Sequence, residues 1–298
     1  MSLLLEKIEF TQNECLRLLR WQGNAQTLES LEANGRTLQK TGLGGRWHSH
    51  GEMELTLFTR GSGRRYVGDH AGTFDHTDCV LLGSHLPHCW TESGPTDGYV
   101  LQFHLPIEHP LQHLGGGKEL QILFTAAKLG LKFSPSTTNK ALSLIERIAK
   151  TNKLARAGLL LELLSLLCSS IKNSSTALSK TSFVSFTDSN NRTRIESVVQ
   201  WILEDFTNPL SLNEAIQRSA MSRATLCRQF HRHTGKTFTS FVTSVRLTHA
   251  HQLLTQTKHS ISEVAYVSGF GSLTQFNASF RKQYNMAPRE LRKTLASL

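Results

Sequence analysis

Three side chains near the start of the chain have the types and spacing needed to bind a metal ion or a polar ligand. His48 and His50 are separated by one residue, and Glu54 follows four positions later. Because successive side chains of a β-strand point to opposite faces, these three positions share one face of an extended segment. Imidazole and carboxylate groups gathered on one face suit a divalent transition metal.

The residues around this trio predict short β-strands. Apolar runs such as Leu55–Phe58, Val80–Leu82 and Tyr99–Phe103 alternate with Gly, Asp and Pro residues. Barrels of short strands produce this pattern. We therefore expect residues 1–115 to form a double-sheet β-barrel.

Residues 42–61 and 78–88 resemble the two motifs of cupin β-barrels. In metal-binding cupins, two paired histidines, a glutamate and a distant histidine converge inside the barrel. Here those four places are occupied by His48, His50, Glu54 and His88. The resemblance therefore implies a set of three histidines and one carboxylate, which suits a divalent transition metal with an open coordination position.

The cupin resemblance also leaves other uses of these four residues open. Sensor relatives of this barrel commonly bind a small organic molecule in the cavity. The second motif departs from its usual glycine, proline and glycine at Thr77, Gly83 and His85. A metal site, the polar lining of an effector pocket and purely structural histidines are therefore three open interpretations. The remaining histidines expected at turns or on the surface are His70, His76, His85 and His104.

A duplicated pattern occupies the last third of the chain. The residues of the first copy, Ser222, Leu226, Phe230 and Gly235, are matched fifty positions later by Ser272, Phe276, Phe280 and Asn285. Serine is a good helix N-cap, apolar residues four apart share a helix face, and glycine and asparagine readily adopt the left-handed conformation that ends a helix. Each copy predicts a helix-turn-helix whose later helix can enter a DNA major groove.

The charge distribution favours DNA binding over a simple helical bundle. Residues 191–298 contain 14 Lys and Arg against 6 Asp and Glu, a balance of +8, whereas the rest of the chain supplies only +2 of the net charge of +10. Positive charge concentrated in one domain is what binding to a phosphate backbone requires.

Residues from about 194 to 296 resemble the DNA-binding domain of AraC/XylS-type bacterial transcription regulators. The matching stretches are Ser222–Gly235, Ile261–Ser272, Phe280–Lys282 and Ala287–Pro288. The resemblance implies a first helix at 192–206, helix-turn-helix units at 211–233 and 260–284, a connecting helix at 238–254 and a final helix from Pro288. In this family the two recognition helices lie in successive major grooves, so one chain reads two adjacent half-sites.

The same resemblance assigns roles along the two recognition helices. The side chains expected at base edges are Arg223, Ala224, Cys227 and Arg228 in the first copy, and Leu273, Thr274, Asn277 and Ala278 in the second. Arg228 can pair with guanine and Asn277 with adenine. The cations expected at phosphates are Arg232, Lys236, Arg281 and Lys282, whereas Leu226, Phe230, Phe276 and Phe280 are expected in the core. The first copy departs from the family pattern at Ala215–Ile216, where a large apolar residue followed by alanine is usual. It also departs at Ser219–Ala220, where an apolar residue and glycine are usual.

Between the two ends of the chain, residues 116–171 are expected to form a helical connector. Lys118–Leu129 and Thr138–Ala149 have helical periodicity, and Leu154–Cys168 is dense in leucine but too short and too interrupted by charges for a transmembrane helix. Its leucine surface needs a partner, either the barrel or the same helix of a second subunit. Residues 172–191, rich in Ser and Thr, are expected to be a flexible linker.

The expected fold class is therefore α+β. An N-terminal cupin-like β-barrel, residues 1–115, is followed by helices and then by an all-α domain, residues 192–298, with two helix-turn-helix motifs. Five cysteines without a CxxC pair, and an N-terminus without the features of a signal peptide, predict a reducing cytoplasm and no membrane partner.

These features predict a cytoplasmic, sequence-specific transcription regulator and not an enzyme. Its expected partners are a double-stranded DNA operator and a small-molecule effector, with a second copy of the chain as a further candidate and RNA polymerase if the protein is an activator. No cofactor is certain, and a divalent transition metal in the barrel is the one candidate. The alternative is a metal-dependent cupin enzyme, a dioxygenase or isomerase, that carries a DNA-binding domain.

Overall fold

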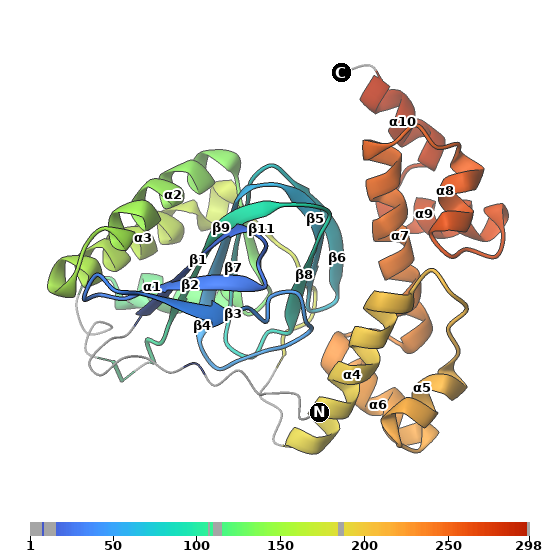
Figure 1. The fold of residues 1–298 in the computed structure, drawn as a ribbon, viewed down its shortest axis with the longest axis horizontal. Helices are drawn as coiled ribbons and strands as arrows, with labels where there is room; N and C mark the ends of the chain where they lie inside the picture. The colour runs from blue at the N-terminus through green and yellow to red at the C-terminus, as the bar shows by residue number, and fades with distance from the viewer. Residues whose placement is uncertain (1–7, 9–15, 107, 110–114, 184–187, 297–298) are drawn as a thin grey trace. The chain divides into compact units, whose positions relative to one another are not determined.

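The computed structural model describes residues 8, 16–106, 108–109, 115–183 and 188–296. The chain divides into two compact units, residues 1–63 with 74–185, and residues 186–298 with the short stretch 64–73. β-Sheets and three helices make up the N-terminal part, and helices make up the part after residue 188 (Figure 1). The predicted α+β class is confirmed. The expectations placed on the N-terminal segment and on Cys15 lie outside the described residues.

Two antiparallel sheets form the N-terminal part. The strands are β1 (Leu16–Gly23), β2 (Thr27–Leu31), β3 (Thr37–Thr41), β4 (Met53–Arg60), β5 (Ser62–Val67), β6 (His70–Asp75), β7 (Asp78–Leu82), β8 (His88–Glu92), β9 (Thr96–Phe103), β10 (Leu131–Phe133) and β11 (Ser175–Ala177). One sheet has the order β11-β10-β7-β4-β9-β1-β2-β3 and the other β6-β5-β8. The apolar runs in the sequence fall in β4, β7 and β9, which are neighbours in the larger sheet.

The alternation of side chains along β4 separates the two faces of the larger sheet. Leu55 and Leu57 are buried in the core shared with the helices. Glu54, Thr56 and Phe58 point to the other face, where they line a cavity together with residues of β1, β8 and β9. Both sheets therefore enclose the space that receives Glu54, which is the arrangement expected of a cupin-like barrel.

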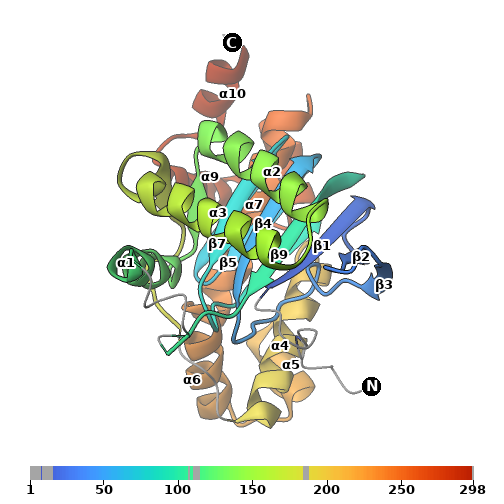
Figure 2. The same ribbon diagram turned by 90° about the vertical axis from the view of Figure 1, so that its left-hand side faces the viewer.

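Three helices cover the outer face of the larger sheet: α1 (Gly117–Ala127), α2 (Pro135–Ala149) and α3 (Lys153–Ser174) (Figure 2). By length and composition alone α3 could cross a membrane. However, its leucines at 159, 160, 163, 164 and 167 are buried in the core with the sheet, α1 and α2. Core packing therefore accounts for most of the leucine surface of this helix.

The segment expected to be a flexible linker, residues 172–191, is largely ordered. Helix α3 continues to Ser174, and Ser175–Ala177 forms β11, which pairs with β10 in the register Leu131↔Ala177. Strand β10 itself lies in the stretch expected to be helical. Backbone pairing between segments far apart in sequence stabilises both strands, and no local composition reveals it. Residues 184–187 lie outside the described part of the chain.

The C-terminal helices match the elements implied by the duplicated pattern. They are α4 (Ser189–Asp205), α5 (Leu212–Ser219), α6 (Arg223–Thr234), α7 (Phe238–Gln256), α8 (Ile261–Val267), α9 (Leu273–Tyr284) and α10 (Pro288–Ala296). Ser222 and Ser272 accept hydrogen bonds from the amides of Thr225 and Gln275, so both predicted N-caps are confirmed. Gly235 and Asn285 end α6 and α9 with φ of 67° and 55°, the left-handed conformation expected for both.

Candidate functional sites

The histidines and glutamate singled out in the sequence converge in the barrel. His48 pairs with His88 through two backbone hydrogen bonds, of 3.1 and 2.9 Å, which bring the segment before β4 next to β8. The ligand atoms of His48, His50 and His88 all lie within 4.8 Å of one another. Glu54 completes the group, with its carboxylate oxygens 3.1 Å from His50 Nε2 and 3.7 Å from His88 Nε2.

Backbone carbonyls set the proton positions of two of these rings. Nδ1 of His48 is 2.7 Å from Arg46 O, and Nδ1 of His88 is 2.7 Å from Leu86 O. Since a carbonyl only accepts, each Nδ1 carries a proton, which makes Nε2 the nitrogen that lacks one in the neutral form of the ring. His88 Nε2 is buried and makes no hydrogen bond within the described residues. This is how protein histidines are prepared to bind a metal through Nε2.

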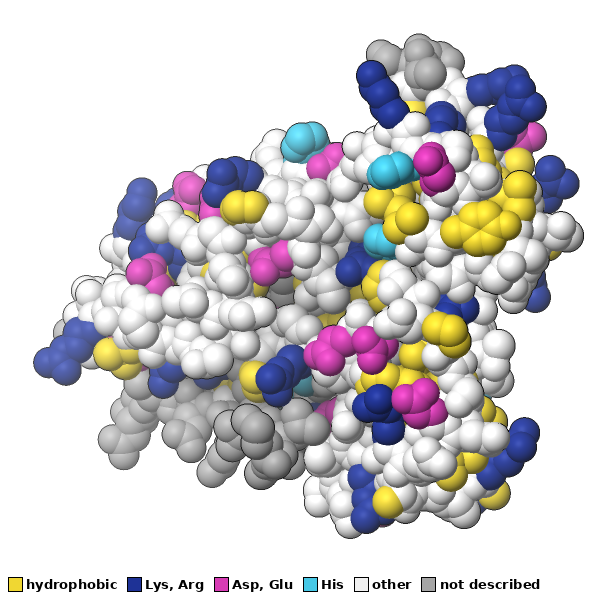
Figure 3. All heavy atoms as spheres, turned by 45° about the vertical axis from the view of Figure 1, so that its right-hand side comes forward, with side chains coloured by type: hydrophobic (Ala, Val, Ile, Leu, Met, Phe, Trp, Pro, Cys, Tyr) yellow, Lys and Arg dark blue, Asp and Glu magenta, His cyan; other side chains and the backbone are white. Residues whose placement is uncertain are grey.

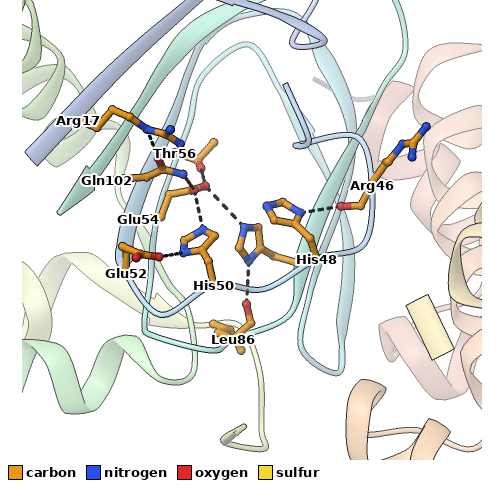
Figure 4. A network of polar contacts seen from close by, with 10 residues as sticks. Arg17, Arg46, His48, His50, Glu52, Glu54, Thr56, Leu86 and Gln102 are labelled. Atoms are coloured by element: carbon orange, nitrogen blue, oxygen red, sulfur yellow. Dashed lines mark hydrogen bonds and ion pairs between the residues drawn. The ribbon is translucent and has the colours of Figure 1, made fainter. Parts of the chain in front are cut away.

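A polar network holds Glu54 in place (Figure 4). Thr56 donates from its hydroxyl to Glu54 Oε1 at 2.6 Å, and Gln102 donates from its amide to Oε2 at 2.9 Å. Gln102 is in turn oriented by Arg17, whose Nε donates to Gln102 Oε1 at 2.8 Å. These hydrogen bonds fix the orientation of the Glu54 carboxylate.

The electrostatics of the site favour a negative carboxylate beside a neutral imidazole. Burial alone raises the pKa of Glu54, but the hydrogen bond with His50 and the neighbouring imidazoles outweigh it and hold that pKa far below its usual range. Burial, followed by the proximity of His48, lowers the pKa of His88 well below its usual value. Near neutral pH the site thus presents an ionised carboxylate and an imidazole with a free lone pair, the forms that bind metals.

The volume of the cavity limits what this site can hold. The cavity measures about 40 Å³, with aromatic walls from Trp21, Phe58 and Trp90 and a polar end at His48 and Glu54. Pockets for drug-sized organic ligands measure roughly 300–1,000 Å³. The donor set fits a metal ion with a solvent molecule, and the cavity is smaller than pockets that hold drug-sized ligands.

Sequence reasoning missed Arg17, Thr56 and Gln102. Two of the three had a visible signal, because Thr56 has the same strand parity as Glu54, and Gln102 is a polar residue inside the apolar run of β9. Other histidines in the described part of the chain do not contribute ring nitrogens to this group. His76 and His85 take left-handed turn conformations, with φ of 57° and 63°, and His104 is exposed. His85 stands where the cupin motif usually has glycine, which agrees with its positive φ.

The two recognition helices separate core from surface as expected. Leu226 and Phe230 of α6, and Phe276 and Phe280 of α9, are fully buried. The positions expected at base edges are all exposed: Arg223, Ala224, Cys227, Arg228, Leu273, Thr274, Asn277 and Ala278. Among the expected phosphate contacts, Arg232, Arg281 and Lys282 are exposed, and Lys236 is partly buried. Lys and Arg side chains recur over the surface of this helical part of the chain (Figure 3).

Comparison with known proteins bears on the helical part. A family model described as a helix-turn-helix domain matches residues 216–294, from within α5 to within α10. The transcriptional activator RhaS of Salmonella schwarzengrund is 33% identical over 104 residues, which are 35% of this chain and 37% of that protein. Over its helical part the chain is therefore similar to helix-turn-helix transcription regulators.

Two solved structures align with different shares of this chain. A transcriptional regulator with an AraC-type DNA-binding domain from Chromobacterium violaceum is 28% identical and covers 37% of this chain and 97% of its own, with a TM-score of 0.34. The structure of apo ToxT from Vibrio cholerae aligns over 95% of this chain and 98% of its own at 14% identity, with a TM-score of 0.36. The helix-turn-helix family match begins at residue 216, after the barrel, so the candidate metal site is argued from its own geometry.

Proposed function

We propose that this chain is a transcription regulator that binds operator DNA through α6 and α9 and senses a divalent transition metal in its N-terminal barrel. One observation carries the DNA-binding half of the proposal. In both copies of the helix-turn-helix, the expected core positions are buried and every expected base-reading position is exposed. Arg228 and Asn277 then offer the bidentate hydrogen bonds that distinguish guanine and adenine in a major groove.

The family relationship supports regulation of transcription. RhaS is a transcriptional activator, and the similarity to it spans about a third of its length. The proposal includes activation of transcription, which involves RNA polymerase. It also includes assembly of the chain into a homodimer. In this reading the chain acts by coupling two binding events and not by catalysis.

The barrel half of the proposal depends on the convergence of four donors. His48 and His88 offer Nε2 lone pairs, Glu54 is ionised, and His50 is close enough to exchange its contact with Glu54 for a shared ligand. A bound divalent ion would supply a positive centre common to β4, β8 and the segment before β4. The small volume of the cavity speaks against the alternative, a metal-dependent enzyme, because a substrate has no room beside the donors.

Two measurements test the proposal. Mass spectrometry of protein purified without chelator should find about one transition metal per chain, and little in a His48→Ala/His50→Ala variant. Selection from a random DNA pool should return a bipartite sequence with two half-sites about 10 base pairs apart. Absence of metal under all loading conditions would leave the four residues as pocket lining, and absence of any enriched DNA sequence would remove the regulatory function.

A further inference from the structure

The connecting helix α7 carries the cores of both helix-turn-helix units on adjacent stretches. Phe230 of the first unit packs against Phe238 and Phe241, with ring centroids 5.9 and 5.6 Å apart. The core of the second unit includes Leu247, Ala250 and Leu254 of the same helix. Arg246 lies in the sequence of α7 (Phe238–Gln256) between these two stretches.

Arg246 binds the backbone of the first unit. Its Nε donates to Phe206 O at 2.7 Å, and its Nη2 donates to Asn208 O at 2.8 Å. Phe206 is the C-cap of α4, so its carbonyl has no partner within the helix. The guanidinium satisfies this group and places a positive charge at the negative end of the helix.

The turn of the second unit packs onto the same place. Gly269, with φ of 84°, lies so close that a Cβ there would be 2.8 Å from Phe206 O and 2.9 Å from both Arg246 Nε and Thr207 O. One position earlier, the hydroxyl of buried Ser268 is 3.2 Å from His249 Nδ1. The His249 ring also packs edge-on against Phe206, with centroids 5.0 Å apart.

Three segments thus meet at one point: Phe206–Asn208 of the first unit, Arg246 and His249 of α7, and Ser268–Gly269 of the second unit. We call them the junction. Without it, each unit would be held to α7 by its own core alone. With it, the units also touch each other directly, which removes freedom to rotate about α7.

We propose that the junction, with Arg246 as its positioning residue, fixes the orientation of α6 relative to α9 and thereby sets the half-site spacing that the protein accepts in DNA. This inference rests on the proposed function, because spacing has meaning only if both helices read DNA. Arg246 is not assigned to any DNA contact. Its effect is on the placement of the helices that make those contacts.

The DNA test compares an operator obtained by selection with versions that carry two inserted or deleted base pairs between the half-sites. We expect the full-length protein to lose at least about 100-fold in affinity on insertion, because the second helix is rotated out of register. Arg246→Ala should bind the original operator about 10-fold more weakly than the wild type. Insertion of two base pairs should then lower the affinity of this variant by less than about 5-fold. Arg246→Lys, which keeps the charge and one donor, should be intermediate.

Arg194→Ala provides the matched control. Arg194 Nη1 donates to Ala220 O at 3.2 Å, also an arginine capping a helix end, but entirely within the first unit. This variant should keep the spacing preference of the wild type. The inference would be overturned if Arg246→Ala and Arg246→Lys kept the same spacing preference as the wild type and Arg194→Ala. If Arg246→Ala does not fold, the ratio of the affinities of Arg246→Lys for the original and the lengthened operator decides.

A second measurement needs no DNA and separates failure of the junction from failure of the proposed function. Spin labels would be attached to the exposed Cys227 of α6 and to Ala278→Cys of α9, in full-length protein with Cys15 and Cys168 changed to serine. We expect a narrow distance distribution between the labels in the wild-type background and a clearly broader one with Arg246→Ala. Identical distributions would overturn the role of the junction even if DNA binding is established.

Discussion

Ala220 and Gly269 end the first helices of the two helix-turn-helix units, and both have positive φ, 49° and 84°. A Cβ at position 269 would lie less than 3 Å from three atoms of the junction, so glycine is required there. Ala220 is exposed, and its Cβ is therefore accommodated. The unusual alanine of the first copy is tolerated because Arg194 contacts the carbonyl of Ala220 while the residue itself is exposed.

Replacing Ala220 by glycine should stabilise the protein. Holding an L-residue in the left-handed region costs about 1–2 kcal/mol, and glycine removes this cost. Glycine is also more flexible in the unfolded chain, which lowers the free energy of unfolding by about 0.5–1 kcal/mol and offsets part of the gain. We expect Ala220→Gly to raise the free energy of unfolding by about 0.5–1 kcal/mol in urea titrations. Gly269→Ala is the paired variant and should lower it by more than 2 kcal/mol. A loss of stability in Ala220→Gly would show that the turn is not strained.

Two arginines on exposed faces of the recognition helices should have different effects on DNA binding. Arg228→Ala should weaken binding to the selected operator by about 1–3 kcal/mol and relax the preference at one base pair. Arg281→Ala should weaken binding to all sequences alike and reduce the slope of log affinity against log salt by about 1. Fluorescence anisotropy with operator and scrambled DNA at several salt concentrations measures both. A uniform loss for Arg228→Ala would place that side chain at the backbone.

Gln102 should matter for metal affinity although it is not a ligand. It holds Glu54 Oε2 at 2.9 Å and is itself oriented by Arg17. Outer partners of this kind change metal affinity about 10–100-fold. We expect Gln102→Ala to weaken Zn²⁺ binding by this factor in competition with a chelator. Gln39→Ala, on the exposed strand β3, is the control and should have no effect. Equal affinities for both variants would mean that Glu54 needs no support from Gln102.

His233 should make stability depend on pH. Burial, followed by the charges of Arg192 and Arg232, lowers the pKa of His233 to about 4 in the folded protein. In the unfolded chain the pKa is about 6.5, so the unfolded state binds the proton first. The contribution of His233 to the free energy of unfolding is therefore complete above pH 6.5. It is lost as the pH falls toward 4, by at most about 1.4 kcal/mol per pH unit. Urea midpoints of wild type and His233→Gln should therefore converge between pH 7.5 and 5. Parallel pH profiles would contradict this.

The sequence predicted best what is determined locally. Ser222, Ser272, Gly235 and Asn285 act as caps through neighbours within four residues, so their roles could be read from residue types alone. The strand parity of His48, His50 and Glu54 predicted a shared face in the same way.

What the sequence could not predict depends on distant contacts. The pairing of β10 with β11 joins residues more than forty positions apart, and the composition of 172–191 instead indicated a linker. The same holds for the hydrogen bonds from Gln102 to Glu54 and from Arg246 to Phe206. The size of the cavity also depends on the assembled barrel.

The central claim is that the barrel site and the DNA-binding helices act on each other, and one titration tests it. Affinity for the selected operator would be measured with Zn²⁺, Mn²⁺, Fe²⁺ or Ni²⁺ and with chelator, for the full-length protein and for His88→Ala. We predict that one of these metals changes operator affinity at least 5-fold in the wild type, that operator DNA changes metal affinity by the same factor, and that His88→Ala abolishes both effects. Operator affinity that is unchanged by every metal, in a protein shown to bind the metal, would contradict the account.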